Sequence, residues 1–188
     1  TVYGRQISLS SSEEKQIRES ISNGVNAKLR SYQLEGVRWL AAMRRNHHGC
    51  LLADEMGLGK TLQVLSHLYA LGKTDMPHLV IAPTSLVYNW QSEIKKFIPS
   101  WENRIGVQLH SPDKTKQLLI VSYDILRLNI DKYKQIEYDT IIIDEAQIIK
   151  NRETQKYKAI KTLKSLHHII LTGTPIENSI DDIWSHFM

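Results

Sequence analysis

The chain has 188 residues, with 41% hydrophobic and 23% charged residues and a formal net charge of +4 at pH 7. This composition is typical of one soluble globular domain with a sizeable core, and the positive charge weakly favours an anionic partner. The single cysteine excludes an internal disulfide and favours a reducing compartment. No apolar run reaches the length of a membrane span, and no secretory signal is visible.

Two helices are predicted before the first strand. Ser11 with Glu14 resembles a capping box, and Gly24 resembles a helix stop, so the first helix is expected to end at Gly24. A second helix is predicted from Tyr32 to about Arg45, because its apolar residues follow helical spacing.

Apolar strands and helical segments alternate through the rest of the chain. Strands are predicted at 49–53, 78–83, 118–123, 139–145 and 167–173. Helices are predicted from about Lys60 and over 85–97. This alternation predicts an α/β fold, a mainly parallel sheet with helices on both faces. A polar motif follows each strand, so we expect five motifs at the carboxyl edge of the sheet, where such folds bind ligands.

One connection does not fit a simple parallel order. A possible strand over 104–110 is separated from the strand at 118–123 by only about seven residues, whereas a parallel crossover needs about a dozen or more. Either the two strands are not a consecutive parallel pair, or residues are absent from the chain between them.

The stretch ADEMGLGKTL resembles the phosphate-binding pattern G-x-x-x-x-G-K-[ST], except that Asp54 stands at the first glycine position. Gly57 and Gly59 allow a tight turn whose backbone N–H groups point at phosphate oxygens. Lys60 supplies a cation for the β- and γ-phosphates, and Thr61 supplies a hydroxyl for Mg²⁺ where a helix begins. The alternative is a chance glycine turn, but the place between an apolar strand and a helix favours a nucleotide site.

The second half of such a site is predicted in the stretch TIIIDEAQ. Asp144 would hold Mg²⁺, directly or through water, and Glu145 would orient and activate the attacking water. The alternative is a surface acidic pair that begins a helix, where the helix dipole favours carboxylates. The glycine loop elsewhere in the chain favours the catalytic interpretation.

Six motifs in order resemble those of SWI/SNF-type ATPases of helicase superfamily two, which move on double-stranded DNA without separating its strands. They are LRSYQLEGVRWL (29–40), DEMGLGKTLQ (54–63), APTSLVYNWQSEIKKF (82–97), SYDIL (122–126), DEAQIIKN (144–151) and LTGTPIEN (171–178). The resemblance implies a three-layer RecA-like P-loop NTPase fold. It covers residues 29–188 as the first, ATP-binding lobe, leaves 1–28 as an N-terminal helical extension, and includes no second lobe.

The resemblance also implies roles for individual residues around ATP and Mg²⁺. Gln33 would read the base, Asp54 is typical of the SWI/SNF-type loop, and Gln147 replaces a more frequent histidine and would couple the γ-phosphate side to the TGTP motif. The predicted catalytic residues are Lys60, Asp144, Glu145 and Gln147, and the metal ligands are Thr61 and Asp144. The predicted nucleotide-binding residues are Gln33, Met56, Gly57, Leu58, Gly59, Lys60, Thr61 and Leu62.

For double-stranded DNA, the resemblance implies an edge of six residues. They are Thr84, Ser122, Tyr123, Lys150, Asn151 and Thr174. The stretch from Lys150 to Lys164 adds modest independent support, because it carries six Lys or Arg and only one acidic residue, and a basic helix can follow phosphates. The alternative for this stretch is an ordinary solvated face.

Several histidines, the cysteine and two tryptophans are expected to have structural roles and not functional ones. The pairs His47–His48 and His167–His168 lack the spacing and the neighbours of a zinc site. Cys50 lies in an apolar strand and is expected in the core, and Trp90 and Trp101 are expected to be packing residues.

We therefore expect the ATP-binding lobe of a DNA-dependent ATPase that displaces or remodels protein–DNA complexes, with RNA polymerase or another nucleoprotein as a candidate partner. Without a second lobe and its arginine finger, the chain alone should bind ATP–Mg weakly and hydrolyse it slowly. The motif spacing and the DEAQ variant favour a bacterial or archaeal, HepA/RapA-like relative, which would be cytoplasmic and nucleoid-associated; a eukaryotic one would be nuclear. The alternatives are an RNA-unwinding lobe of the DEAD-box kind and a nucleotide-gated interaction module.

Overall fold

Six parallel strands form one sheet in the computed structural model, which describes residues 9–53 and 57–173. The strands are β1 (Cys50–Leu52), β2 (His78–Ala82), β3 (Ile105–Gln108), β4 (Leu118–Ser122), β5 (Glu137–Ile143) and β6 (Lys164–Leu171). Their order is β1-β6-β5-β2-β4-β3, and every neighbouring pair is parallel. This confirms the predicted fold class.

Helices connect these strands and precede them. They are α1 (Ser11–Gly24), α2 (Ser31–Arg45), α3 (Lys60–Leu71), α4 (Thr84–Phe97), α5 (Tyr123–Leu128), α6 (Ile130–Tyr133) and α7 (Gln155–Lys161), with short 3-10 helices η1 (Pro99–Arg104) and η2 (Ala146–Ile149). Among the helices of the described ranges, none is long and apolar enough to cross a membrane.

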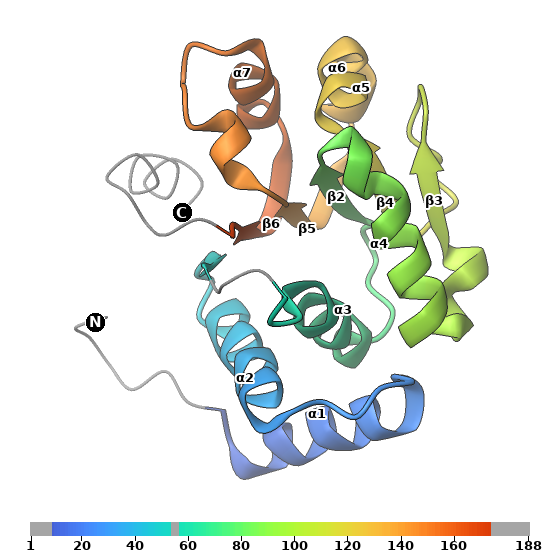
Figure 1. Ribbon diagram of the computed structural model, residues 1–188, viewed down its shortest axis with the longest axis vertical. Coiled ribbons are helices and arrows are strands. Elements are labelled where there is room, and N and C mark those ends of the chain that lie inside the picture. Colours follow the sequence, from blue (N-terminus) through green and yellow to red (C-terminus); the bar gives the residue numbers. More distant parts are fainter. Residues whose placement is uncertain (1–8, 54–56, 174–188) are drawn as a thin grey trace.

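The sheet separates two hydrophobic cores. Successive side chains of a strand point to opposite faces, and β2 shows this clearly: Val80 and Ala82 pack with α1 to α4, whereas Leu79 and Ile81 pack with α5 to α7. Figure 1 shows α5, α6 and α7 on one side of the sheet and α1, α2 and α3 on the other. Because both faces are covered, the strands are apolar along their length, as the sequence pattern indicated.

Of the two alternatives for the short connection between β3 and β4, the first, that the strands are not a consecutive parallel pair, is wrong. The two strands are parallel neighbours, with Ile105 opposite Leu118, and residues 109–117 join them. The rule fails because β3 has only four residues, so the chain has to return about 13 Å, which a segment of this length easily spans. The side-chain oxygen of Gln108 accepts the N–H of Asp113 at 2.8 Å and shapes the return.

Helix α1 begins with a different capping pair from the predicted one. The N-cap is Ser10, whose hydroxyl oxygen accepts the N–H of Glu13 at 3.3 Å, while the Glu13 carboxylate accepts the N–H of Ser10 at 2.7 Å. The predicted pair of Ser11 and Glu14 is therefore one residue out of register. The predicted end at Gly24 agrees with the structure.

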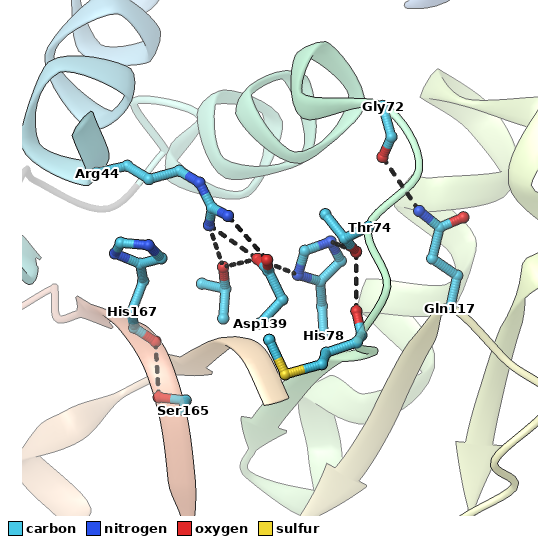
Figure 2. Close-up of polar contacts among 10 residues, drawn as sticks. Arg44, Gly72, Thr74, His78, Gln117, Asp139, Ser165 and His167 are labelled. Carbon is cyan, nitrogen blue, oxygen red and sulfur yellow. Dashed lines mark hydrogen bonds and ion pairs between the residues drawn. The ribbon is translucent and has the colours of Figure 1, made fainter. Parts of the chain in front are cut away.

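A partly buried ion pair ties α2 to the sheet near the amino ends of the strands (Figure 2). Both terminal nitrogens of Arg44 lie 2.8 Å from the carboxylate oxygens of Asp139 on β5, and one of them also donates to the Thr140 hydroxyl at 3.1 Å. His78 Nδ1 lies 3.3 Å from the same carboxylate. These polar contacts lie at the end of the strands opposite to the predicted motifs.

Candidate functional site

The glycine loop lies between β1 and α3, as predicted. Gly57 and Gly59 have positive φ angles of 87° and 75°, a conformation that strains residues with a side chain. Gly59 is the N-cap of α3, so the N–H groups of Lys60, Thr61 and Leu62 lie in the first turn, where they have no partner within the helix. Such a helix start, with its partial positive charge, is suited to bind phosphate.

Two residues named in the sequence analysis, Asp54 and Met56, lie outside the described residues. Leu58 does not, and its carbonyl oxygen is held by the start of α2. It accepts the Tyr32 hydroxyl and the Gln33 side-chain amide, each at 3.3 Å.

Gln33 lies directly against the loop. It is 8% exposed, its side-chain oxygen accepts the N–H of Arg30 at 2.9 Å, and a Cβ added to Gly59 would lie 2.5 Å from its amide nitrogen. The structure thus places Gln33 beside the predicted phosphate loop, where it supports the loop backbone. The role of this amide in reading a base stays a prediction.

Asp144 follows β5 and accepts three hydrogen bonds, from Trp90, Tyr123 and Glu145. The indole N–H of Trp90 on α4 donates to Oδ2 at 2.8 Å, and the backbone N–H of Glu145 donates to Oδ1 at 2.9 Å. The hydroxyl of Tyr123 donates to the main-chain carbonyl of Asp144 at 2.6 Å. Trp90 packs in the core, as expected, but the contact of its indole N–H with the site was not predicted. An indole N–H inside an amphipathic helix that follows a strand was the one available signal.

The electrostatics of Asp144 connect it to the glycine loop. Burial raises the pKa of its carboxyl, and the Glu145 charge adds to the rise. The hydrogen bonds from Trp90 and from the Glu145 backbone lower this pKa, as does the charge of Lys60, and the balance is a raised pKa. Lys60 begins α3 directly after the loop that follows β1, and Asp144 directly follows β5, so the two predicted halves of the site lie at the same, carboxyl edge of the parallel sheet.

The donor set at this edge suits Mg²⁺. The hydroxyl of Thr61 and the carboxylate of Asp144 are hard oxygen ligands, which this cation prefers. Within residues 9–53 and 57–173, no group of three or more His, Cys, Asp or Glu side chains could hold a metal by itself. Mg²⁺ at phosphate sites takes one or two protein oxygens together with substrate phosphates and waters, so such a group is not required.

Glu145 and Gln147 extend the site to β6. Glu145 adopts a left-handed backbone conformation with φ 50° and ψ 52°. The Gln147 amide donates to the Glu145 carboxylate, and its carbonyl oxygen accepts the Thr172 hydroxyl at 3.1 Å. The backbone N–H of Thr172 in turn donates to Leu52 at the end of β1, at 3.1 Å. A continuous chain of contacts therefore joins the acidic motif, the start of the TGTP motif and the strand before the glycine loop.

The residues predicted to face DNA divide into two groups. Thr84, Lys150 and Asn151 are exposed near the carboxyl ends of the strands. Ser122 and Tyr123 are 5% and 2% exposed; the Ser122 hydroxyl caps α5 by accepting the N–H of Ile125 at 3.2 Å, and the Tyr123 hydroxyl is bound to Asp144. Any contact of Tyr123 with DNA in this conformation would therefore come from its main chain.

The sixth predicted DNA residue, Thr174, lies outside the described residues. In the basic stretch around α7, Lys156 pairs with Asp124 of α5 at 3.0 Å, and Lys158 pairs with Glu153 at 3.4 Å. Part of the positive charge is thus already compensated within the protein. Of the other structural interpretations, Cys50 is buried, and burial raises the pKa of its thiol to about 12.

A parallel sheet with helices on both faces, a glycine loop that caps a helix, and an acidic pair on a nearby strand end define a RecA-like P-loop NTPase lobe. The model of the SNF2-related domain matches residues 32–188. The chain therefore belongs to the SNF2-related family, which confirms the resemblance to SWI/SNF-type ATPases.

Relatives and solved structures agree with this assignment. The chain is 38% identical over 182 residues to YwqA of Bacillus subtilis, assigned as an ATP-dependent helicase/translocase, and the match covers 89% of this chain and 19% of that protein. It is 34% identical to Helicase SWR1 of Saccharomyces cerevisiae over 172 residues, 84% of this chain and 11% of that protein. The Sulfolobus solfataricus SWI2/SNF2 ATPase core in complex with dsDNA superposes with a TM-score of 0.79 at 40% identity, over 87% of this chain and 36% of that one. The chain thus spans less than a fifth of the length of YwqA and of Helicase SWR1.

Proposed function

We propose that this chain is the ATP-binding lobe of a DNA-dependent ATPase that couples ATP hydrolysis to movement along double-stranded DNA. The observation that carries the proposal is the position of Lys60, Asp144 and Glu145 after parallel strands, at the same carboxyl edge of the sheet. The names of the relatives, ATP-dependent helicases, and the dsDNA complex of a similar ATPase core support the substrate and the partner.

The glycine loop binds the phosphates of ATP. The backbone N–H groups at the start of α3 and the Lys60 ammonium contact the phosphate oxygens, and Gln33 holds the loop in shape through Leu58. Thr61 and Asp144 would hold Mg²⁺, and the ion would supply neutralisation of the charge on the β- and γ-phosphates.

The acidic motif orients the attacking water. Glu145 accepts a hydrogen bond from Gln147, which leaves the rest of its carboxylate to accept a proton from water. Gln147 also contacts Thr172, so a displacement of the TGTP motif would be felt at the water-orienting carboxylate. This contact supports the predicted coupling role of Gln147.

Duplex DNA is proposed to lie along the edge that carries Thr84, Lys150 and Asn151. These side chains are exposed at the same end of the sheet as the nucleotide site. A second lobe, with an arginine finger, is proposed to complete the site, because such a residue contributes about 10³- to 10⁵-fold to the rate of comparable phosphoryl transfer. Displacement or remodelling of proteins on DNA is the proposed outcome, with nucleoprotein complexes as partners.

The test is a steady-state ATPase assay of the intact protein with and without duplex DNA. We expect duplex DNA to stimulate hydrolysis more than single-stranded RNA does. Glu145→Gln should lower kcat by about 10²-fold or more and preserve nucleotide binding, because a positioned proton acceptor contributes about 10²- to 10⁴-fold. Glu153→Gln, a change at an exposed carboxylate, is the matched control and should leave both quantities unchanged.

Two results would contradict the proposal. Stimulation by single-stranded RNA in place of duplex DNA would favour an RNA-unwinding lobe. Biological activity that survives in Glu145→Gln, with hydrolysis abolished, would favour a nucleotide-gated module. The 188-residue chain by itself is expected to hydrolyse ATP slowly, and robust DNA-stimulated turnover by it would exclude the need for a second lobe.

A further inference from the structure

The indole of Trp90 points its only polar atom at the proposed metal ligand. Trp90 lies in α4 and is 2% exposed, and its Nε1 is 2.8 Å from Oδ2 of Asp144. An indole N–H can donate one hydrogen bond and accept none, so this contact uses the whole polar capacity of the side chain. Asp144 is itself only 9% exposed, so few waters can take the place of this donor.

The contact leaves Asp144 still able to bind a cation. Oδ1 accepts a hydrogen bond from the backbone N–H of Glu145, and Oδ2 accepts one from the indole N–H of Trp90. These two bonds restrict rotation of the carboxylate group about the Cβ–Cγ bond. Each carboxylate oxygen has about two acceptor positions, and one hydrogen bond on each leaves the other for a metal or a metal-bound water. The Tyr123 hydroxyl fixes the main chain of the same residue at 2.6 Å.

We propose that Trp90 is a positioning residue of the metal site: its N–H holds the Asp144 carboxylate in the orientation that receives nucleotide-bound Mg²⁺. The inference rests on the proposed function, since it needs Asp144 to be a metal ligand. It assigns Trp90 a role that packing alone does not require, because an apolar ring of the same shape would fill the core equally well. Outer-shell partners of this kind typically contribute about 10- to 100-fold to metal affinity or activity.

The test measures binding, not turnover. The intact protein is titrated with the fluorescent analogue mant-ATP, once in excess Mg²⁺ and once in EDTA. The dissociation constant in EDTA divided by that in Mg²⁺ gives the contribution of the metal to nucleotide affinity. For Trp90→Phe, we expect this ratio to fall by about ten-fold or more, or to disappear. The affinity in EDTA should stay within about two-fold, because the glycine loop and Lys60 are unchanged.

Three further variants separate the effect of the indole N–H from that of the ring volume. Trp101→Phe removes the same volume at a residue that is also 2% exposed but packs beside Tyr69, so its ratio should stay at the wild-type value. Benzothienylalanine at position 90 keeps the two-ring shape without the N–H and should behave like Trp90→Phe. Fluorotryptophan at position 90 keeps the N–H and should behave like the wild type. This set remains decisive if Trp90→Phe does not fold.

The outcomes are distinct. A wild-type ratio in the benzothienylalanine protein would overturn the inference and leave the proposed function intact. An equal loss of affinity in Mg²⁺ and in EDTA would also overturn it, because it would show that Trp90 acts only through the fold. Failure of the wild-type protein to bind mant-ATP in either condition would contradict the proposed function, and the inference would fail with it.

Discussion

Glu145 is held in a left-handed backbone conformation that costs a residue with a side chain about 1–3 kcal/mol. Its N–H donates to the Asp144 carboxylate and its own carboxylate accepts from Gln147, so neighbouring contacts hold it in place. This residue links β5 to the short 3-10 helix η2. At this scale the site depends on Gln147, which joins Glu145 to Thr172.

Substitution of Gln147 tests this dependence. Gln147→Leu removes both the donor to Glu145 and the acceptor of the Thr172 hydroxyl. We expect kcat to fall by about 10²-fold, because a small displacement of a catalytic group has effects of this size, while mant-ATP binding stays within about two-fold. Gln147→His keeps one donor and one acceptor and should retain most of the activity. An unchanged kcat in Gln147→Leu would contradict the role of the bridge.

At the scale of elements, α1 shows how a tertiary contact selects among local signals. The pattern S-x-x-E occurs twice in succession, as Ser10 with Glu13 and Ser11 with Glu14. In the structure Glu13 completes the capping box and also pairs with Arg45 of α2 at 2.8 Å, while Glu14 pairs with Arg38 of α2. With Ser10 as the N-cap, the carboxylates of Glu13 and Glu14 both form ion pairs with arginines of α2.

The two registers predict different mutant stabilities. Ser10→Ala should reduce the free energy of unfolding by about 1 kcal/mol, because it removes the N-cap acceptor of α1. Ser11→Ala should change it by less than about 0.5 kcal/mol, since Ser11 is an exposed residue inside the first turn. Urea denaturation of both variants measures the difference. A larger effect at Ser11 would mean that the register of the structure is wrong.

At the scale of the whole molecule, the amino ends of the strands contain a buried polar region that the sequence did not indicate. The Arg44–Asp139 pair joins α2 to β5, and His67 of α3 and His78 of β2 lie beside it. Burial lowers the pKa of His67 to about 3 and that of His78 to about 4, and the positive charge of Arg44 contributes to both shifts.

These histidines predict loss of stability in acid. In the unfolded chain they take up protons below about pH 6.5, whereas in the folded protein they stay neutral down to about pH 4 or 3. The unfolded state therefore binds more protons in this window, and the free energy of unfolding falls as the pH drops from 6.5 towards 4. Burial raises the pKa of Asp139, but its hydrogen bonds from Arg44 and Thr140 and the nearby positive charges lower it overall. Its contribution is lost only below its ordinary pKa of 3.8.

Urea midpoints at several pH values between 7 and 4 test this. His67→Gln should remove the uptake of one proton, which is about 1.4 kcal/mol per pH unit of slope within the window. His110→Gln, at an exposed position, should leave the slope unchanged. Identical slopes in His67→Gln and the wild type would show that His67 does not carry the effect.

Much of the site could be predicted from the sequence because its parts are local. The strand, glycine turn and helix around Gly59 are contiguous, and so are β5 and the acidic pair, so pattern and spacing were enough to name them. Membership of the SNF2-related family and the parallel α/β fold are confirmed. The roles of the individual site residues stay predictions, and those of Met56 and Thr174 fall outside the described residues.

The rest depended on contacts between residues far apart in the chain. Trp90 was assigned to packing because nothing within α4 reveals an acceptor that lies 54 positions further along. The DNA role of Tyr123 was implied by the resemblance and stays a prediction, but no local pattern indicated that its hydroxyl is directed inward to Asp144. The β3–β4 pair was doubted because the crossover rule assumes strands of average length, and β3 is short.

The sequence by itself determined which elements form and which chemistry they carry, because helix and strand periodicity, glycine turns and strand-end polar motifs are properties of neighbouring residues. Only the tertiary structure decided how the carboxylates are held. The hydrogen bonds of Trp90 and Tyr123 to Asp144, and of Gln147 to Thr172, each join separate elements. Their geometry exists only after the sheet has brought α4, α5, β5 and β6 together, so no local pattern encodes it.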